Sequence, residues 1–193
     1  KKIFKKDPEN GLDLVHDGLL IAIKENYLNQ EAEAYQILGL FNFELTEYNL
    51  SYKNYKKAIA IYDNMRLVSV KNFYASRQLI NTYYPTGRSA EMIADYNNAI
   101  HYYNKYLNNV SSPINIVKVK TALGDVYLKK KDLKNAEKNY QQALKIENKK
   151  GNKNGIITLN LKLGELEKEQ KNNEKAIQYY RSSQNTAFEI NDD

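Results

Sequence analysis

Residues 122–144 read ALGDVYLKKKDLKNAEKNYQQAL, and this stretch decides the fold. Leu123-Gly124 stands near its start, and Ala136, Tyr140 and Ala143 follow on one face of a 3.6-residue period. Forty residues later the same positions hold Leu163-Gly164, Ala176, Tyr180 and Ser183. Agreement of several positions at one shift is typical of an internal repeat.

Two more divergent copies precede this pair. Leu38-Gly39 is followed by Ala58, Tyr62 and Met65, and Leu79-Ile80 is followed by Ala99, Tyr103 and Tyr106. In both copies 19 residues separate the glycine-like position from the alanine, against 12 in the later two. The first two repeats are therefore predicted to carry seven extra residues between their helices. These form either longer helices or a connector, and Pro85 and Gly87 favour a connector in the second repeat.

The helical periodicity runs through the whole chain, and no segment shows the sustained alternation of a strand. Ser112-Pro113 and Asp7-Pro8 read as helix starts, and Lys150-Gly151 reads as a helix end. Nine helices are predicted, at about 8–27, 30–46, 52–68, 71–84, 90–109, 113–130, 133–149, 154–169 and 173–190.

Small residues at fixed positions predict close crossings between paired helices. Gly39, Gly124 and Gly164 lie in first helices, and alanines such as Ala136 lie opposite them. Because a single helix pair cannot bury its apolar face, neighbouring pairs are expected to stack into a one-dimensional array. The sequence thus predicts one all-α solenoid domain over residues 1–193. It comprises a leading helix at 8–27 and repeats at about 30–68, 71–109, 113–149 and 154–190.

The pattern Leu-Gly-x-x-Tyr, then Ala-x-x-x-Tyr-x-x-Ala, resembles the tetratricopeptide repeat over residues 8–190. The chain departs from that pattern at Asn42 and Glu167, where an aromatic residue is expected, and at Ile80, where glycine is expected. The resemblance implies a right-handed α-solenoid that binds proteins or peptides and is not an enzyme. The period of 40–41 residues and the Lys-Gly-Asn linker resemble arrays of Bacteroidetes-like sensor histidine kinases and regulators.

The same resemblance implies that the first helix of each pair lines a concave groove. The positions mapped onto it are Glu33, Gln36, Leu40, Phe43, Tyr74, Arg77, Asn81, Tyr84, Lys118, Thr121, Asp125, Leu128, Thr158, Leu161, Glu165 and Lys168. The predicted partner-binding residues among them are Tyr74, Arg77, Asn81, Tyr84, Gln36, Phe43, Lys118 and Asp125. The densest cluster is Tyr74, Arg77, Asn81 and Tyr84, in which Asn and Arg suit peptide amides or carboxylates.

The composition limits the sites and partners expected of the chain. The chain of 193 residues has no Cys, and its two histidines, His16 and His101, lie far apart, so we expect no metal site, no cofactor and no catalytic residues. The net charge of +6 is concentrated in residues 118–153 and comes almost entirely from Lys, which makes nucleic acid an unfavoured partner. No apolar run is long enough to span a membrane, and the compartment, cytoplasmic or periplasmic, stays open.

Three interpretations of function remain. The first is a scaffold or sensor part of a bacterial signalling protein, within a two-component system. The second is the regulatory domain of a histidine kinase whose catalytic part lies outside this chain. The third is a cytosolic signal-peptide receptor of a DNA-binding regulator. Because the sequence stops just after a second helix, we also expect either an excised piece of a longer protein or end-to-end self-association.

Overall fold

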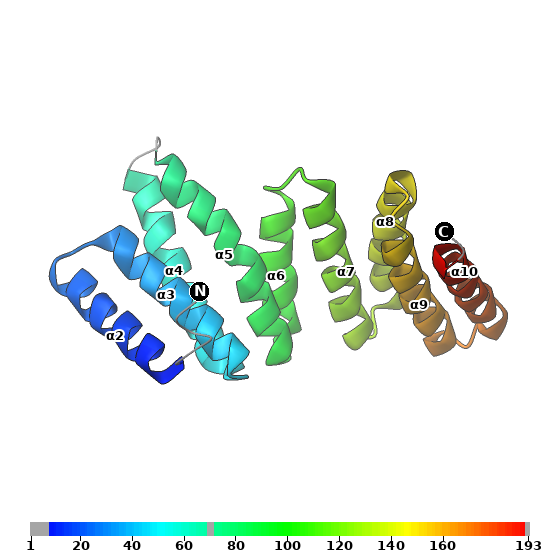
Figure 1. Cartoon of the computed structure of the whole chain (residues 1–193), viewed down its shortest axis with the longest axis horizontal. Coiled ribbons are helices and arrows are strands. Elements are labelled where there is room, and N and C mark those ends of the chain that lie inside the picture. The colour runs from blue at the N-terminus through cyan, green and yellow to red at the C-terminus, as the bar shows by residue number, and fades with distance from the viewer. Residues whose placement is uncertain (1–7, 69–71, 192–193) are drawn as a thin grey trace. The chain divides into compact units, whose positions relative to one another are not determined.

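The structure is a computed structural model, and it describes residues 8–68 and 72–191. Every regular element within these residues is an α-helix, as predicted (Figure 1). The helices are α2 (Pro8–Lys24), α3 (Leu28–Glu44), α4 (Tyr48–Val68), α5 (Phe73–Met92), α6 (Tyr96–Leu107), α7 (Pro113–Lys129), α8 (Leu133–Lys150), α9 (Lys153–Glu169) and α10 (Asn173–Asn191). None of these helices is long and apolar enough to cross a membrane.

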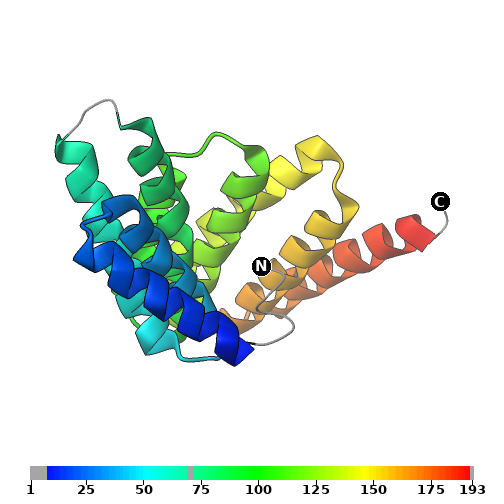
Figure 2. The ribbon, with the colours of Figure 1, turned by 60° about the vertical axis from the view of Figure 1, so that its left-hand side comes forward.

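The chain divides into two compact units, Lys1–Tyr106 and Leu107–Asp193. In the first, α3 packs against α2 and α4, and α4 packs against α5. In the second, α7 packs on α8, α8 on α9 and α9 on α10, so that each helix lies beside its successor (Figure 2). Each unit buries its own apolar cluster, centred on Tyr62 in the first and on Tyr140 in the second.

Helix α5 differs most from the prediction, which ended it at residue 84 and placed a connector at Pro85 and Gly87. The helix instead continues through Pro85 to Met92. A proline inside a helix removes one backbone hydrogen bond. Here Thr86 Oγ1 donates to the carbonyl of Thr82 at 2.7 Å, and Ser89 Oγ donates to that of Pro85 at 3.1 Å. Burial of Thr82, Thr86 and Gly87 outweighs the local tendency to break. Lys71, the predicted first residue of this helix, lies outside the described residues, as does Asp7.

Four glycines meet four tyrosines at one constant spacing, which corrects the predicted repeat register. A Cβ on the glycine would lie within 2.9 Å of the tyrosine ring in the pairs Gly39–Tyr55, Gly87–Tyr103, Gly124–Tyr140 and Gly164–Tyr180. The two residues are 16 apart in every pair. Gly87, and not Ile80, is therefore the crossing glycine of the second repeat. Twelve residues after the glycine come Ser51, Ala99, Ala136 and Ala176, each of them buried.

The seven extra residues predicted inside the first two repeats are consequently absent. The prediction placed the alanine of the first repeat seven residues too late and the glycine of the second seven residues too early. Gly39 and Gly87 are 48 residues apart, and the following intervals are 37 and 40. The additional length lies between the first two repeats, where α4 has 21 residues and α5 has 20.

Tight turns join successive helices through a residue in the left-handed region. Its φ is positive at Asn26, Thr46, Ala94, Lys131 and Lys171, and also at Gly151, the predicted helix end. In each case the next residue donates its backbone N–H to a carbonyl five residues earlier, as Asp95 does to Ala90 at 2.9 Å. This is the Schellman arrangement, in which glycine is usual. Five of the six residues carry a side chain, so these turns hold a conformation that L-residues adopt at some cost.

Candidate binding face of the first helices

Six residues of α5 repeat at helical spacing along one side of the helix. This α5 stripe consists of Tyr74, Arg77, Asn81, Tyr84, Arg88 and Glu91. The corrected register moves the repeat by seven residues, which is nearly two full turns, so the predicted positions stay on the same side. Helix α5 therefore keeps all four predicted residues on this side and adds Arg88 and Glu91, which the sequence reasoning missed. The sequence signal that could have identified Arg88 is the pair Gly87-Arg88, which occupies the same repeat position as Gly124-Asp125.

Three contacts join the α5 stripe and its neighbours to α3. The Tyr74 hydroxyl donates to Glu33 Oε1, and Gln36 Nε2 donates to Thr82 Oγ1. The guanidinium of Arg88 lies 5.5 Å from the ring centroid of Phe43. Gln36 also accepts from Tyr62 of α4 at 3.1 Å. These contacts hold the first helices of repeats one and two side by side, with predicted residues at the seam.

Arg88 is held in place by aromatic neighbours. It is half-buried and hydrogen-bonds the hydroxyl of Tyr84. Burial lowers the pKa of Arg88, but the bond to Tyr84 and the nearby Tyr103 and Glu91 outweigh it and raise the pKa overall. The ring of Tyr84 packs 5.5 Å from that of Tyr103, so Tyr84 contributes to the core as well as to this face. Arg88 is thus a fixed, permanently charged donor.

Between these anchored groups, other side chains remain open to solvent. Leu40 of α3 is 42% exposed, and Arg77 and Asn81 of α5 are exposed. We call the set Leu40, Phe43, Arg77, Asn81 and Arg88 the unit 1 face. It combines an apolar surface with amide and guanidinium donors, the mixture expected of a surface that binds a peptide.

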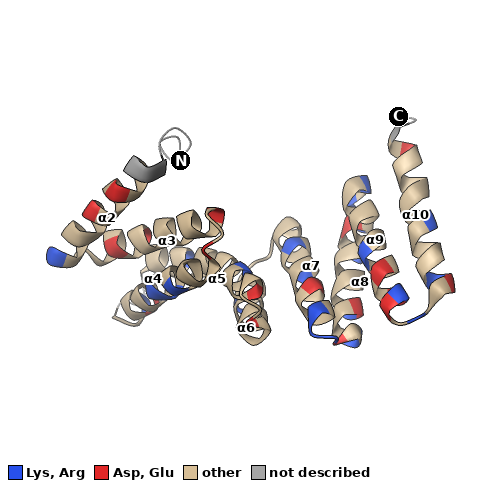
Figure 3. Cartoon of the chain, turned by 90° about the horizontal axis from the view of Figure 1, so that it is seen from below, with Lys and Arg blue, Asp and Glu red and all other residues tan. Residues whose placement is uncertain are grey.

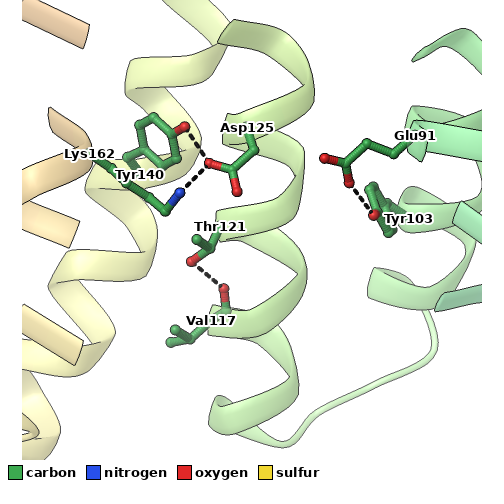
Figure 4. Close-up of polar contacts among 7 residues, drawn as sticks. All are labelled: Glu91, Tyr103, Val117, Thr121, Asp125, Tyr140 and Lys162. Atoms are coloured by element: carbon green, nitrogen blue, oxygen red, sulfur yellow. Dashed lines mark hydrogen bonds and ion pairs between the residues drawn. The ribbon is translucent and has the colours of Figure 1, made fainter. Parts of the chain in front are cut away.

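The predicted residues of the second unit, Asp125 and Lys118, make contacts of their own. Asp125 Oδ1 accepts from the Tyr140 hydroxyl at 2.6 Å and from Lys162 Nζ at 2.7 Å (Figure 4). Asp125 therefore links α7 to α8 and α9 through its two hydrogen bonds. Lys118 also has a polar or electrostatic contact within the chain. Asp125 and Lys118 belong to the second compact unit, and the unit 1 face is defined within the first.

Several tyrosine hydroxyls of the first unit have pKa values shifted by their surroundings. Desolvation is the main cause that raises the pKa of Tyr52 to about 12 and raises those of Tyr55, Tyr62, Tyr83, Tyr84, Tyr102, Tyr103 and Tyr106. For Tyr74, the hydrogen bond to Glu33 is the largest cause of a raised pKa. The Tyr103 hydroxyl donates to Glu91 Oε2 at 2.7 Å (Figure 4). All these groups favour the neutral phenol in the folded state.

The charge pattern of the second unit is mixed. Asp and Glu are interspersed with Lys and Arg along α7 to α10, and Lys outnumbers the acidic residues on α7 and α8 (Figure 3). Lysines form ion pairs there with Glu169 (Lys131) and Asp125 (Lys162), each at 2.7 Å, and with Glu147 (Lys150) at 3.8 Å. Among the residues that the structure describes, no group of three or more His, Cys, Asp or Glu side chains could hold a metal ion.

Comparison with known proteins agrees with this architecture. Residues 116–187 match the family model of the tetratricopeptide repeat. None of the curated proteins matches the chain. The solved structures that resemble it include a MamA, with a TM-score of 0.70 and 16% identity over 98% of this chain and 96% of the other.

Two Rap proteins are also similar. The apo form of RapI has a TM-score of 0.67 and 15% identity, over 94% of this chain and 72% of RapI. The Rap conjugation gene regulator of plasmid pLS20, in complex with the Phr* peptide, has a TM-score of 0.66 and 16% identity. That match covers 84% of this chain and 44% of the regulator. The chain therefore has a tetratricopeptide-like helical-repeat fold, and residues 116–187 match the family model of that repeat.

Proposed function

We propose that this chain is a non-enzymatic module that binds a peptide or an extended protein segment on the unit 1 face. In the proposed context it forms the sensor or scaffold part of a larger bacterial signalling protein. The observation that carries the proposal is the unit 1 face itself. There, exposed Leu40, Arg77 and Asn81 lie beside Phe43 and Arg88, which contacts within the unit hold in place.

The chemistry of this surface suits an extended chain. An Asn side chain offers one acceptor and two donors, which match the N–H and C=O of a peptide backbone. Arg77 and Arg88 can take carboxylates through the guanidinium fork. Leu40 and Phe43 supply apolar contact to a side chain of the ligand. Because Arg88 and Phe43 are already positioned, little side-chain freedom is lost on binding.

The similar structures support the same kind of role. The regulator of pLS20 was solved with a peptide, and it is described as a regulator of conjugation genes. The likeness to this chain extends to the fold, and transfer of peptide binding is part of our proposal. The likeness to a gene regulator also favours a signalling context for this chain, either as the regulatory domain of a histidine kinase or as the receptor part of a DNA-binding regulator.

A matched pair of double variants tests the location. Arg77 and Asn81 are four residues apart on α5, and Arg181 and Asn185 have the same spacing on exposed positions of α10. Peptides would be selected against the full chain from a random phage-displayed library. Binding of the selected peptides should fall about tenfold or more in Arg77→Ala/Asn81→Ala, since centrally placed polar contacts often carry 1–2 kcal/mol each.

The control variant, Arg181→Ala/Asn185→Ala, should bind these peptides as the wild type does. Circular dichroism would establish that both variants keep their helices. Equal binding by the two variants, or a loss in the control alone, would exclude the unit 1 face. A library that yields no peptide with saturable binding would contradict the proposed function as a whole.

A further inference from the structure

A separate cavity lies in the second unit, between α8, α9 and α10. It has a volume of about 430 Å³. Its lining consists of Glu137, Gln141, Asn160, Glu167, Lys175, Gln178, Tyr179 and Ser182. These three helices lie in sequence beside one another (Figure 2). Neither the unit 1 face nor any position predicted for the groove contributes to this lining, so the cavity needs a separate explanation.

Two deeply buried polar side chains point to a ligand. Glu167 is 2% exposed, and Oε2 accepts from Asn172 Nδ2 at 2.8 Å. Asn160 is 4% exposed, and its Nδ2 donates to Ser182 Oγ at 3.1 Å. The second carboxylate oxygen of Glu167 and the amide oxygen of Asn160 have no hydrogen-bond partner within the described part of the chain, and neither atom is itself buried, so both are reached by solvent.

Buried carboxylates are costly unless a cation or several donors satisfy them. The equivalent position, three residues after the crossing glycine, holds Tyr127 in the third repeat and the buried Asn42 in the first. Asn42 bonds Glu47 as Glu167 bonds Asn172, so the repeat accommodates a polar residue at this position but does not require a carboxylate. Glu167 occupies the same place after Gly164. A single amide partner is a poor environment for a carboxylate with so little contact with water. Solvent reaches the free oxygen of Glu167, so a ligand with N–H donors could take the place of water there.

Carboxylates determine the net charge of the cavity lining. Glu137 adds a second carboxylate, of which Oε1 already accepts from Gln141 Nε2 at 2.8 Å. The only cationic side chain in the lining is Lys175, which is exposed and forms no ion pair within the described residues. Two carboxylates against one ammonium leave the cavity with a net negative charge. A donor-rich cation is therefore the complementary ligand.

We propose that this cavity binds a guanidinium group, either of an arginine side chain in a peptide or of a small guanidinium compound. The guanidinium is planar, weakly hydrated and carries five N–H donors, so it can satisfy Glu167 and the Asn160 carbonyl together. A primary ammonium is compact and strongly hydrated, and it fits a set of buried, separated acceptors less well. The proposal does not depend on the unit 1 face.

Isothermal titration of the full chain would test it with three probes. Agmatine carries a guanidinium and an ammonium, putrescine carries two ammonium groups on the same four-carbon chain, and acetyl-Gly-Gly-Arg-Gly-Gly-amide presents a peptide arginine. We expect agmatine or the peptide to bind with a Kd of about 1 mM or tighter, and putrescine to bind at least about tenfold more weakly. Whichever guanidinium probe binds more tightly identifies the source.

Three variants locate the binding. Glu167→Gln keeps the shape and should weaken agmatine about tenfold or more, because the charged acceptor is lost. Glu165→Gln, on the exposed side of the same helix, should leave binding unchanged. Lys175→Glu removes a competing cation from a surface position and should strengthen binding several-fold. This last variant tests the proposal even if Glu167→Gln alters the fold, which thermal melts would reveal.

Several results would overturn the proposal. One is that neither agmatine nor the peptide shows saturable binding. Another is that putrescine binds as tightly as agmatine. A third is that agmatine affinity is unchanged in both Glu167→Gln and Lys175→Glu. Because the peptides of the earlier experiment are challenged with variants of α5, that test can fail while this one succeeds, and the reverse.

Discussion

The ring of Tyr140 lies so close to the backbone of Gly124 that a Cβ on that glycine would be 2.3 Å from Cε1. No real side chain fits at such a distance. The hydroxyl of the same tyrosine donates to Asp125, the next residue, at 2.6 Å (Figure 4). One tyrosine therefore binds one turn of the partner helix through both its ring and its hydroxyl, and the same glycine–tyrosine crossing recurs in all four repeats.

Substitution of a crossing glycine should destabilise the second unit. Gly124→Ala should lower the free energy of unfolding by more than about 2 kcal/mol, because the new methyl group forces the α7–α8 pair apart. Urea unfolding followed by circular dichroism would measure this loss. Gly18→Ala is the matched control, since nothing lies within 4 Å of a Cβ there, and it should stabilise by about 0.5–1 kcal/mol. Equal effects of the two substitutions would contradict the crossing.

Relief of the strained turn at Ala94 should stabilise the first unit. Ala94 has φ 59° between α5 and α6, a conformation that costs an L-residue about 1–2 kcal/mol. Ala94→Gly should therefore raise the free energy of unfolding by about 0.5–1 kcal/mol, after allowance for the greater freedom of glycine in the unfolded chain. Ala60→Gly, at an exposed site inside α4, should lower it by about 1 kcal/mol. A change in the free energy of unfolding of the same sign in both variants would contradict the strain assigned to Ala94.

The ion pair between Asp125 and Lys162 is expected to stabilise the second unit. The side chains of Asp125 and Lys162 are 31% and 27% exposed, so their ion pair is only partly screened by water. Asp125→Asn should destabilise by about 1 kcal/mol and make unfolding less dependent on salt concentration. Glu169→Gln breaks a more exposed pair with Lys131 and should have a much smaller effect. A larger loss in Glu169→Gln than in Asp125→Asn would refute the stabilising role of the partly buried Asp125 contacts.

Alkaline pH should destabilise the first unit. Its tyrosines have raised pKa values in the folded state, for example about 12 for Tyr52, against about 10 in the unfolded chain. Folding thus favours the protonated phenols. Their contribution is complete below about pH 10 and is lost as pH rises from about 10 through the folded pKa values.

Urea unfolding at a series of alkaline pH values would measure this loss, with phenolate absorbance recorded in parallel. Tyr52→Phe keeps the ring and removes one titrating hydroxyl, so its stability should fall less between about pH 9 and pH 11 than that of the wild type. If phenolate forms in the folded protein with an ordinary pKa, before any unfolding, the desolvation argument fails.

The sequence predicted that Arg77 and Asn81 share one side of α5 despite a wrong register, and the structure shows both exposed there. Seven residues change the helical phase by only about 20°, so the register error did not move them to another side. Their role in binding stays a prediction. The same property hid the error, since patterns one heptad apart look alike in sequence. Arg88 was missed because Ile80 had been given the position of Gly87. The cavity around Glu167 was missed because its lining residues come from three helices.

The sequence by itself determined the all-α repeat, most helix positions and the helix end at Gly151. These follow from local periodicity and backbone preference, which act over a few residues. Only the tertiary structure decided which glycine meets which tyrosine, why α5 continues through Pro85 and how Asp125 came to hold three helices together. Each of these depends on contacts between residues at least 12 positions apart, and burial there outweighs local propensity.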